Sequence, residues 1–435
     1  MAAGTPVALQ PHPTVVLPFV ALLLCIALLP LAAPHFWERH YPKVSIGLGL
    51  MTAGYYIQVL HHGQPILHSI QEYVSFMALI GSLFVISGGI NIQVKGEATP
   101  VANTLFLLFG AVIANLIGTT GASMLLIRPW IRMNKYRITK FHVVFFIFLV
   151  SNVGGALTPI GDPPLYLGYL RGVPFWWVME HVWSAWLLTV VLLLAVFYFM
   201  DRRNFARAPQ SVAKAETAAE TWQFRGVHHL AFLLLVLLAV FLPPQWKVGT
   251  EAFSVNMSSL LMVTAAAASY FTTPKTIHEA NDFSFGPVKE VAFLFIGIFL
   301  TMVPALELLG SGQGIHLTTP LQYYFTSGSL SAFLDNAPTY LTFLAAAMGN
   351  AQLDVGNAAD VRTFLQSHPA YVVAISLGAV FFGAGSYIGN GPNFMVKAIA
   401  GKAKVHTPGF LGYLFHFSLP ILVPILVVVG WIMMR

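Results

Sequence analysis

Two carboxylates lie in stretches that are otherwise apolar enough to cross a membrane. Asp162 is found in "GALTPIGDPP", directly after the apolar run "FHVVFFIFLVSNVG" that begins at Phe141, and Asp335 is found in "FLDNAPT". An acidic residue at membrane depth is costly, so it is expected to face a cavity and to mark a functional site. The pattern indicates that Asp162 and Asp335 hold a cation or a proton.

Residues with oxygen-bearing side chains surround both acids, and Gly and Pro interrupt the helices beside them. Breaks in a helix expose backbone carbonyls, and hard cations such as sodium favour oxygen ligands. The predicted ion- or proton-binding residues are Asp162, Asp335, Asn336, Thr158, Ser151, Asn152, Thr119, Thr120, Ser386 and Asn390, with Asp162 and Asp335 as the carboxylate ligands of sodium.

Structural roles remain open for the same residues. Ser and Thr in membrane helices often only permit close packing or bond to the backbone one turn back. Asp162 would also suit the cap of a following half-helix. Asp335 would suit a turn. Glu307 would suit the end of a helix at the outer interface.

The composition defines the class of protein. Of 435 residues, 57% are hydrophobic and 9% are charged, and the mean hydropathy is +0.74. Such values predict an all-α polytopic membrane protein with the lipid bilayer as its partner. The net charge of +6 follows the membrane topology, so no nucleic-acid partner is expected. The motifs of common enzyme classes are not found, and no cofactor is expected.

The apolar segments fall into two sets of six, divided by one long hydrophilic stretch. This division predicts a first membrane repeat over residues 1–200, a cytoplasmic linker over 201–227 and a second membrane repeat over 228–435. The apolar segments are 14–33, 44–60, 73–90, 103–127, 141–170 and 183–200, then 228–243, 256–272, 291–309, 319–349, 370–400 and 411–433.

Helix breakers fall on matching elements of the two sets. The fourth segment of each set is interrupted, by "IGTTGAS" and by "LDNAPT", which predicts a re-entrant hairpin in each half. The fifth segment of each is broken at "IGDPP" and at "IGNGP". If neither hairpin crosses the membrane, the halves are inverted relative to each other, with about ten full crossings in total, and hairpins and broken helices meet near the bilayer midplane.

The basic residues agree with this topology. Of the 22 Lys and Arg, all but four fall on the predicted cytoplasmic side, as the positive-inside rule requires. The four on the outer side are Arg171, Lys247, Arg362 and Arg435. Both termini are therefore expected in the periplasm, and the linker near Ala213 in the cytoplasm.

The motifs "GTTGAS", "SNVGGALTPIGDPP", "FLDNAPT" and "GSYIGNGPN" resemble the ion transporter superfamily, and within it most closely the NhaD-type sodium/proton antiporters and their arsenite- and citrate-transporting relatives. The resemblance covers the chain from about residue 40 onward. It implies a homodimer in which each protomer has a scaffold and a transport domain. It also implies that Asp162, Thr158, Ser151, Asn152, Asp335 and Asn336 line the ion site. The chain departs from the expected pattern at two points. "IGDPP" has paired prolines, and the second broken helix has Asn390 and no carboxylate.

The predicted function is exchange of sodium or lithium for protons across a bacterial inner membrane by alternating access. The alternative is cation- or proton-coupled transport of a citrate-like organic anion, or of arsenite, on the same scaffold. Two buried acids and no Lys or Arg in the core motifs favour the cation reading, since an anion site prefers cationic side chains or bare helix N-termini.

Overall fold

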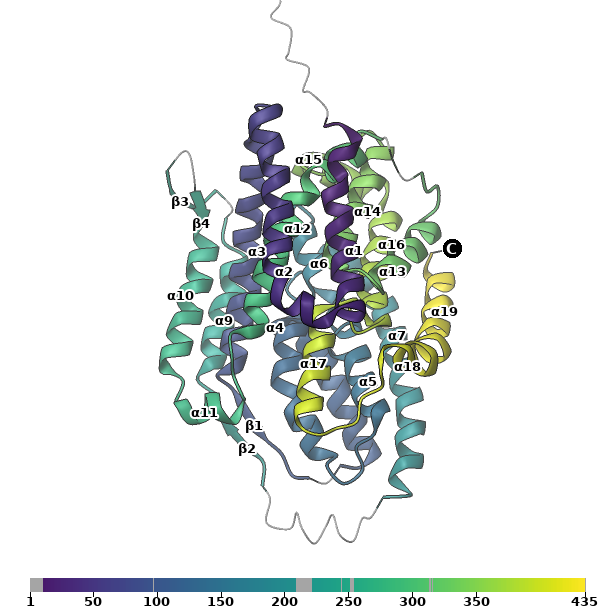
Figure 1. Ribbon diagram of the computed structural model, residues 1–435. Coiled ribbons are helices and arrows are strands. Elements are labelled where there is room, and N and C mark those ends of the chain that lie inside the picture. The colour runs from purple at the N-terminus through teal and green to yellow at the C-terminus, as the bar shows by residue number, and fades with distance from the viewer. Residues whose placement is uncertain are drawn as a thin grey trace, which may run out of the picture.

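The protein is a helical bundle with two small two-stranded sheets at its periphery (Figure 1). The computed structural model describes residues 11–96, 98–208, 221–243, 245–250, 254–312, 314 and 316–434. Seven helices in this part of the chain are long and apolar enough to span a membrane, or eight if the bent pair α15–α16 counts as one span. The all-α, polytopic prediction is confirmed.

The first helices form a long antiparallel arrangement at one side of the molecule. Proline lies in the first turn of α1, α2 and α3, where a backbone N–H would have no partner within the helix. These elements are η1 (Pro13–Val16), α1 (Leu17–Ala32), α2 (Pro34–Gly54), the π-helical turn η2 (Tyr55–Val59), α3 (Gln64–Gly88) and strand β1 (Asn91–Gln93).

Helix α4 (Pro100–Met133) is a hairpin. It leaves helical geometry at Gly118, where φ is 75° and ψ is 153°, within the predicted "IGTTGAS" break. Its two ends meet, because Asn103 near its start and Asn134 just past its end exchange side-chain hydrogen bonds of 2.7 and 3.0 Å. The segment therefore turns back on itself.

The next elements form a broken helix followed by a long span. α5 (Lys140–Leu149) leads into a 3-10 turn, η3 (Val153–Leu157), and the chain is irregular until α6 (Pro163–Leu170). Helix α7 (Trp177–Phe205) extends beyond the predicted end of its segment at residue 200. Residues 209–220, which include Ala213 in the middle of the predicted linker, lie outside the described part of the chain.

Strand β2 (Gln223–Arg225), at the end of the predicted linker, pairs antiparallel with β1, and the second half follows. Helices α9 and α10 are apolar but have only 12 and 16 residues, fewer than the roughly 20 that span a bilayer. The predicted ten crossings therefore stay a prediction. The elements are α9 (His229–Val240), β3 (Lys247–Gly249), β4 (Ser254–Asn256), α10 (Met257–Thr272), α11 (Lys275–Ala280) and α12 (Gly286–Gly310).

A second hairpin and a second broken helix follow. Asn350, at the end of the hairpin, donates a 3.1 Å hydrogen bond to Tyr323 near its start. The first broken helix has its counterpart in α16, η4 and α17. The elements are α13 (Pro320–Ser331), α14 (Asn336–Asn350), α15 (Ala358–Ser367), α16 (Pro369–Phe382), η4 (Gly383–Gly385), α17 (Gly391–Lys402), α18 (Phe410–Tyr413), the π-helical η5 (Leu414–Leu422) and α19 (Val423–Met433).

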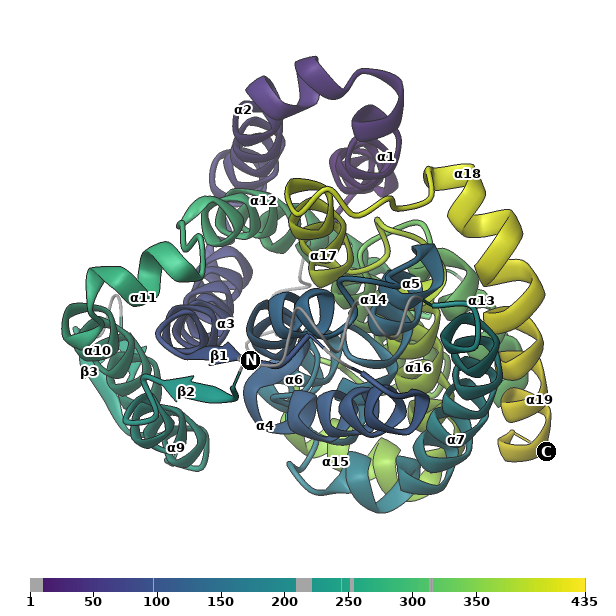
Figure 2. The same cartoon turned by 90° about the horizontal axis from the view of Figure 1, so that it is seen from below.

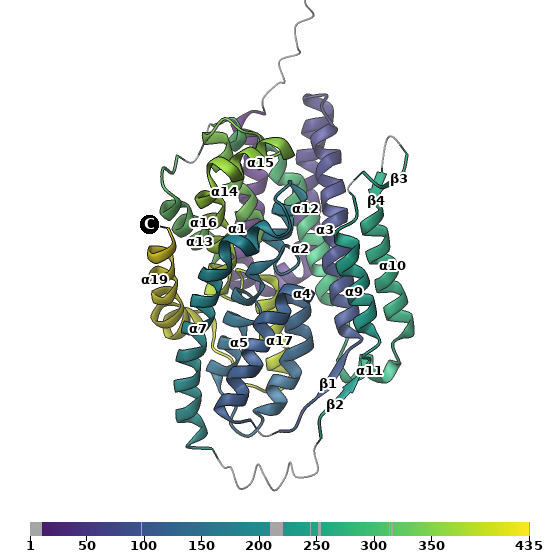
Figure 3. The ribbon, with the colours of Figure 1, turned by 180° about the vertical axis from the view of Figure 1, so that it is seen from behind.

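The two hairpins enter from opposite ends of the molecule. Strand β1, which precedes α4, lies near the lower end, and α15, which follows α14, lies near the upper end (Figures 1 and 3). Seen from below, α3, α9 and α10 form one flank, while α4, α5, α6 and α17 lie toward the centre (Figure 2). The hairpin tips and the breaks of both broken helices can therefore meet inside the molecule.

A buried polar cluster holds the base of the first hairpin. Asp201 is fully buried and accepts hydrogen bonds from Asn103 at 2.9 Å, from Arg137, and from His142, whose Nε2 lies 3.0 Å away. Arg137 also donates to the Ala98 carbonyl. The cluster joins the end of α7 to α4 and α5.

We expect Asp201→Asn to lower the free energy of unfolding by about 3 kcal/mol, because it leaves the buried Arg137 guanidinium without its counter-charge. Thermal or denaturant unfolding in detergent measures the effect. The control is Asp282→Asn, which removes a pair with Lys402 whose side chains are 60% and 71% exposed, so its effect should stay below about 1 kcal/mol. Equal effects of the two variants would contradict a special role for the cluster.

Candidate functional site

Asp162 occupies the N-cap of α6, at the end of the irregular segment that follows η3. The backbone is extended at Asp162, with φ −143° and ψ 144°, and Pro163 begins the helix. Proline suits this first position because its fixed φ is helical and it has no N–H to satisfy. The Asp162 side chain is thereby directed into the protein, where the residue is only 1% exposed.

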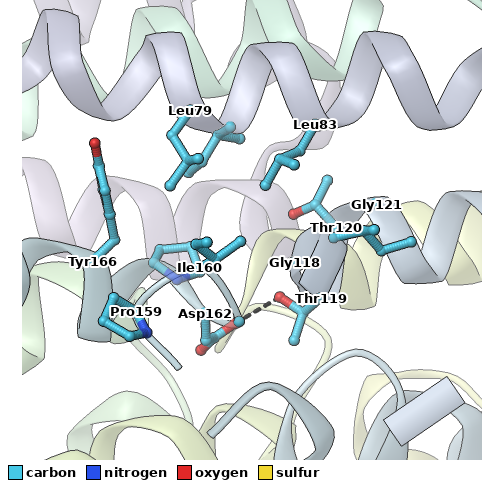
Figure 4. Close-up of a pocket in the computed structure, with 14 residues that line it drawn as sticks. Leu79, Leu83, Gly118, Thr119, Thr120, Gly121, Pro159, Ile160, Asp162 and Tyr166 are labelled. Carbon is cyan, nitrogen blue, oxygen red and sulfur yellow. Dashed lines mark hydrogen bonds between the residues drawn. The ribbon is translucent and has the colours of Figure 1, made fainter. Parts of the chain in front are cut away.

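Three neutral donors from three other elements bind the Asp162 carboxylate. Thr119 Oγ1 donates to Oδ1 at 2.7 Å, and Asn390 Nδ2 donates to the same oxygen at 3.0 Å. Asn336 Nδ2 donates to Oδ2 at 2.6 Å. The bond from Thr119, at the tip of the first hairpin, is drawn in Figure 4. Both hairpins and both broken helices thus meet at one carboxylate.

Four helix N-termini converge at this point. Thr119 begins the second arm of α4 after the break at Gly118, and Asp162 caps α6. Asn336 is the first residue of α14, and Asn390 caps α17. Helix N-termini carry partial positive charge, so their convergence offsets part of the cost of burying an anionic side chain.

A second layer of amides supports Asn390. Its Nδ2 also lies 3.1 Å from the Ser151 carbonyl and 3.2 Å from Asn152 Oδ1. Asn152 in turn donates to Asn393 Oδ1 at 2.7 Å. The Ser151 hydroxyl faces Ser123 at 2.7 Å, so Ser151 contributes its carbonyl, not its side chain, to this group. The sequence also offers Asn393, one turn after Asn390, as an oxygen-bearing residue of the second broken helix, and the structure places it in this second layer.

Two predicted ligands hold the backbone of the site instead. Thr158 Oγ1 donates to the Asn115 carbonyl at 2.6 Å and accepts from the Gly161 N–H. Ser386 Oγ donates to the Ala332 carbonyl at 2.5 Å and accepts from the Ile388 N–H. Each therefore ties the break in a broken helix to the neighbouring hairpin.

Asp335 lies apart from the hydrogen bonds of Asp162. It caps α14, accepting from the Ala337 N–H at 3.0 Å, and is half-buried. Its neighbour Asn336 makes the contact to Asp162. Asn336 Oδ1 is buried and, among the described residues, has no hydrogen-bond partner. The site therefore contains an unused oxygen acceptor next to its carboxylate.

A small cavity of about 20 Å³ borders the site, enough for about one water molecule. Figure 4 shows Leu79 and Leu83 of α3 facing the segment that carries Asp162 and the hairpin tip with Thr119. The cavity lining is Leu79, Ile80, Leu83, Ile117, Gly118, Thr119, Thr120, Gly121, Pro159, Ile160, Gly161, Asp162, Pro163 and Tyr166. Thr120 thus faces the cavity, whereas Asp335 is not part of its lining.

The fold and the site define a class: a polytopic membrane transporter whose buried carboxylate lies between two hairpins and two broken helices. The chain belongs to the CitMHS_2 family, described as "Putative citrate transport", whose model matches residues 9–434. It is also similar to the "46 kDa membrane protein" of Mycobacterium leprae (strain TN), with 25% identity over 331 residues that cover 71% of this chain and 72% of the relative.

The family match agrees with the wider resemblance, which included citrate-transporting relatives, and points to a transporter rather than an enzyme. It does not single out the NhaD-type antiporters within that group. The choice between cation exchange and organic-anion transport therefore depends on the chemistry of the site.

We expect Gly118→Ala to disturb the site without touching Asp162 directly. A residue with a Cβ is strained at φ 75°, and the added methyl would lie 3.2 Å from the Ile160 carbonyl. Strain of this kind costs about 1–3 kcal/mol. Unfolding and transport assays should show lower stability and slower transport. The matched control is Gly47→Ala in α2, where a Cβ would meet nothing within 4 Å; a similar loss in that variant would contradict the local explanation.

Proposed function

We propose that the protein exchanges sodium or lithium for protons across the membrane by alternating access, with Asp162 as the residue at which they compete. The observation that carries the proposal is the Asp162 carboxylate, which is buried and, within the described part of the chain, accepts side-chain hydrogen bonds only from Thr119, Asn336 and Asn390. None of these neutral donors cancels its charge. Binding of a cation or a proton would neutralise this buried charge and is therefore favoured.

Competition follows from general electrostatics. Removing a carboxylate from water disfavours its ionised form, and a nearby cation favours it. A proton and a metal cation are therefore alternatives at Asp162. The unpartnered Asn336 Oδ1 and the hydroxyl of Thr119 supply further oxygens for a cation. Protons that arrive from an acidic exterior would displace sodium, and sodium in the cytoplasm would displace protons.

The second candidate is cation- or proton-coupled transport of a citrate-like anion. Two observations favour it: the family match and the four helix N-termini that converge on the site, since such termini attract carboxylates. In this reading Asp162 holds the coupling cation, and the anion binds to the hairpin tips. The cavity of about 20 Å³ is too small for citrate, so its entry would require the hairpin tips to separate from α3.

The remaining features of the proposal follow the topology. We place the protein in a bacterial inner membrane as two inverted halves with periplasmic termini, and as a homodimer. The hairpins that enter from opposite ends support the inversion. Asp335, as the cap of α14, would stabilise the second hairpin and contribute negative charge near the site as a second sodium ligand.

We expect Asp162→Asn to abolish cation/proton exchange while leaving a folded protein, because the amide keeps the size of the side chain but cannot be ionised. Proton flux is measured in proteoliposomes with sodium, lithium, potassium, citrate or arsenite added in turn. Flux driven by sodium or lithium supports exchange, and flux that needs citrate or arsenite supports the second candidate.

The control for this assay is Glu180→Gln, which removes an exposed acid at the start of α7 and should transport normally. Cation-driven proton flux at the native rate in Asp162→Asn would refute the proposal.

Alternating access predicts that the first hairpin moves against α3. Leu83 of α3 and Ile117 at the hairpin tip line the same cavity, so a disulfide between Leu83→Cys and Ile117→Cys should stop transport. Reduction should restore it. The background is Cys25→Ala, which removes the chain's one cysteine, and the two single-cysteine variants are the controls. Unchanged transport by the crosslinked protein would exclude this movement.

A further inference from the structure

The breaks in the two broken helices have the same construction. Gly155, Thr158, Gly161 and Asp162 precede Gly383, Ser386, Gly389 and Asn390 by a constant 228 residues. In the first, a Cβ on Gly161 would clash with the Gly155 carbonyl, and in the second, a Cβ on the corresponding Gly389 would lie 2.6 Å from the Gly383 carbonyl. Two backbone segments therefore approach in a way that only glycine permits, once in each half.

The side-chain contacts repeat as well. Thr158 and Ser386 each donate to a carbonyl of the hairpin in their own half, at 2.6 and 2.5 Å. Thr119 and Asn336 each begin the second arm of their hairpin, and both donate to Asp162. The two halves thus contribute corresponding groups to one site.

Asp162 and Asn390 are the corresponding residues at its centre. Each caps the helix that follows its break, with φ and ψ of −143° and 144° for Asp162 and −155° and 139° for Asn390. Their side chains are hydrogen-bonded to each other at 3.0 Å, and both are at least 98% buried. One position of the pair carries an acid and the other carries its amide.

We propose that Asp162 and Asn390 are two halves of a single exchange site, in which Asn390 limits the pair to one ionisable group per protomer. Asn390 is then a residue that determines the charge moved in each cycle. A carboxylate at position 390 would lie near the same four helix N-termini. It would also accept a hydrogen bond from an amide at position 162. The inference rests on the proposed role of Asp162 in coupling.

The surroundings of the two positions differ in one respect. Asn390 Nδ2 also donates to the Ser151 carbonyl and to Asn152 Oδ1, and these two oxygens are acceptors that cannot donate to a carboxylate. A transferred acid should therefore work less well than Asp162. Residues in direct contact show coupled effects on substitution, so recovery relative to the single variant is the quantity to measure.

The experiment compares the single variant Asp162→Asn with the double variant Asp162→Asn, Asn390→Asp in proteoliposomes, with folding checked by gel filtration and thermal unfolding. We expect the double variant to transport roughly tenfold faster than the single one, and its unfolding temperature to rise again with the transported cation. The matched control is Asp162→Asn, Asn393→Asp. It places the acid on Asn393, which is also buried in α17 but bonds Asn152, Gly383 and Ser386 instead of Asp162, and it should stay inactive.

A third variant, Asn390→Asp, keeps Asp162 and therefore tests the inference even if the double variant does not fold. It should move more charge per transported cation than the native protein, measured from the reversal potential. A folded double variant no faster than Asp162→Asn, or an unchanged charge ratio in Asn390→Asp, would overturn the inference and leave the role of Asp162 standing. Native transport by Asp162→Asn alone would instead refute the proposed function itself.

Discussion

Burial of one carboxylate is the constraint on which the rest of the structure depends. The Asp162 side chain is buried inside the protein. Four helix N-termini and three neutral donors offset part of the free-energy cost of burying its charge. A continuous transmembrane helix could not provide an N-terminus at this depth, because its N-terminus lies at the membrane surface. The chain must therefore break four helices near one point, and the hairpins and irregular segments follow from that need.

Broken helices leave backbone groups that need partners at membrane depth. Asn115 supplies several of them. Its Nδ2 donates to the Gly154 carbonyl at 2.6 Å, its Oδ1 accepts from the Leu157 N–H at 2.9 Å, and its own carbonyl accepts from Thr158. The Gly161 carbonyl receives the Thr119 N–H at 2.8 Å. In the first half the hairpin therefore completes the hydrogen bonds of the adjacent broken helix, whereas in the second half Asn393 of α17 donates to the Gly383 and Ser386 carbonyls.

Among the described residues, two ion pairs join α6 and α17 to neighbouring elements, and they differ in how deeply they are buried. Arg171, just after α6, binds Glu72 of α3 at 2.7 Å with both side chains about 90% buried. Lys402 of α17 binds Asp282 in an exposed pair, where the hydrogen bond from Lys402 lowers the pKa of Asp282. Separation of Arg171 from Glu72 would leave two buried charges without partners. It would therefore cost more free energy than separation of Lys402 from Asp282.

The sequence alone determined the class of protein and much of its layout. Hydropathy gave the helical membrane class, and Gly and Pro marked the breaks at Gly118, before Asp162 and before Asn390, because these residues act on the local backbone wherever they occur. It also singled out Asp162 as a candidate site residue, since an acid among apolar residues is costly in any fold. The sequence predicted helix ends less accurately. Helix α7 runs to Phe205 and not to residue 200, because packing and not composition decides where a helix ends.

Only the tertiary structure decided how these residues meet. Asn336, and not its neighbour Asp335, bonds to Asp162, because the start of α14 turns one side chain inward and leaves the other to cap the helix. Thr158 and Ser386 bind carbonyls, Ser151 contributes its backbone, and Asn390 reaches Asp162 from 228 residues away. Such contacts depend on the relative position of separate helices, which local sequence patterns do not encode.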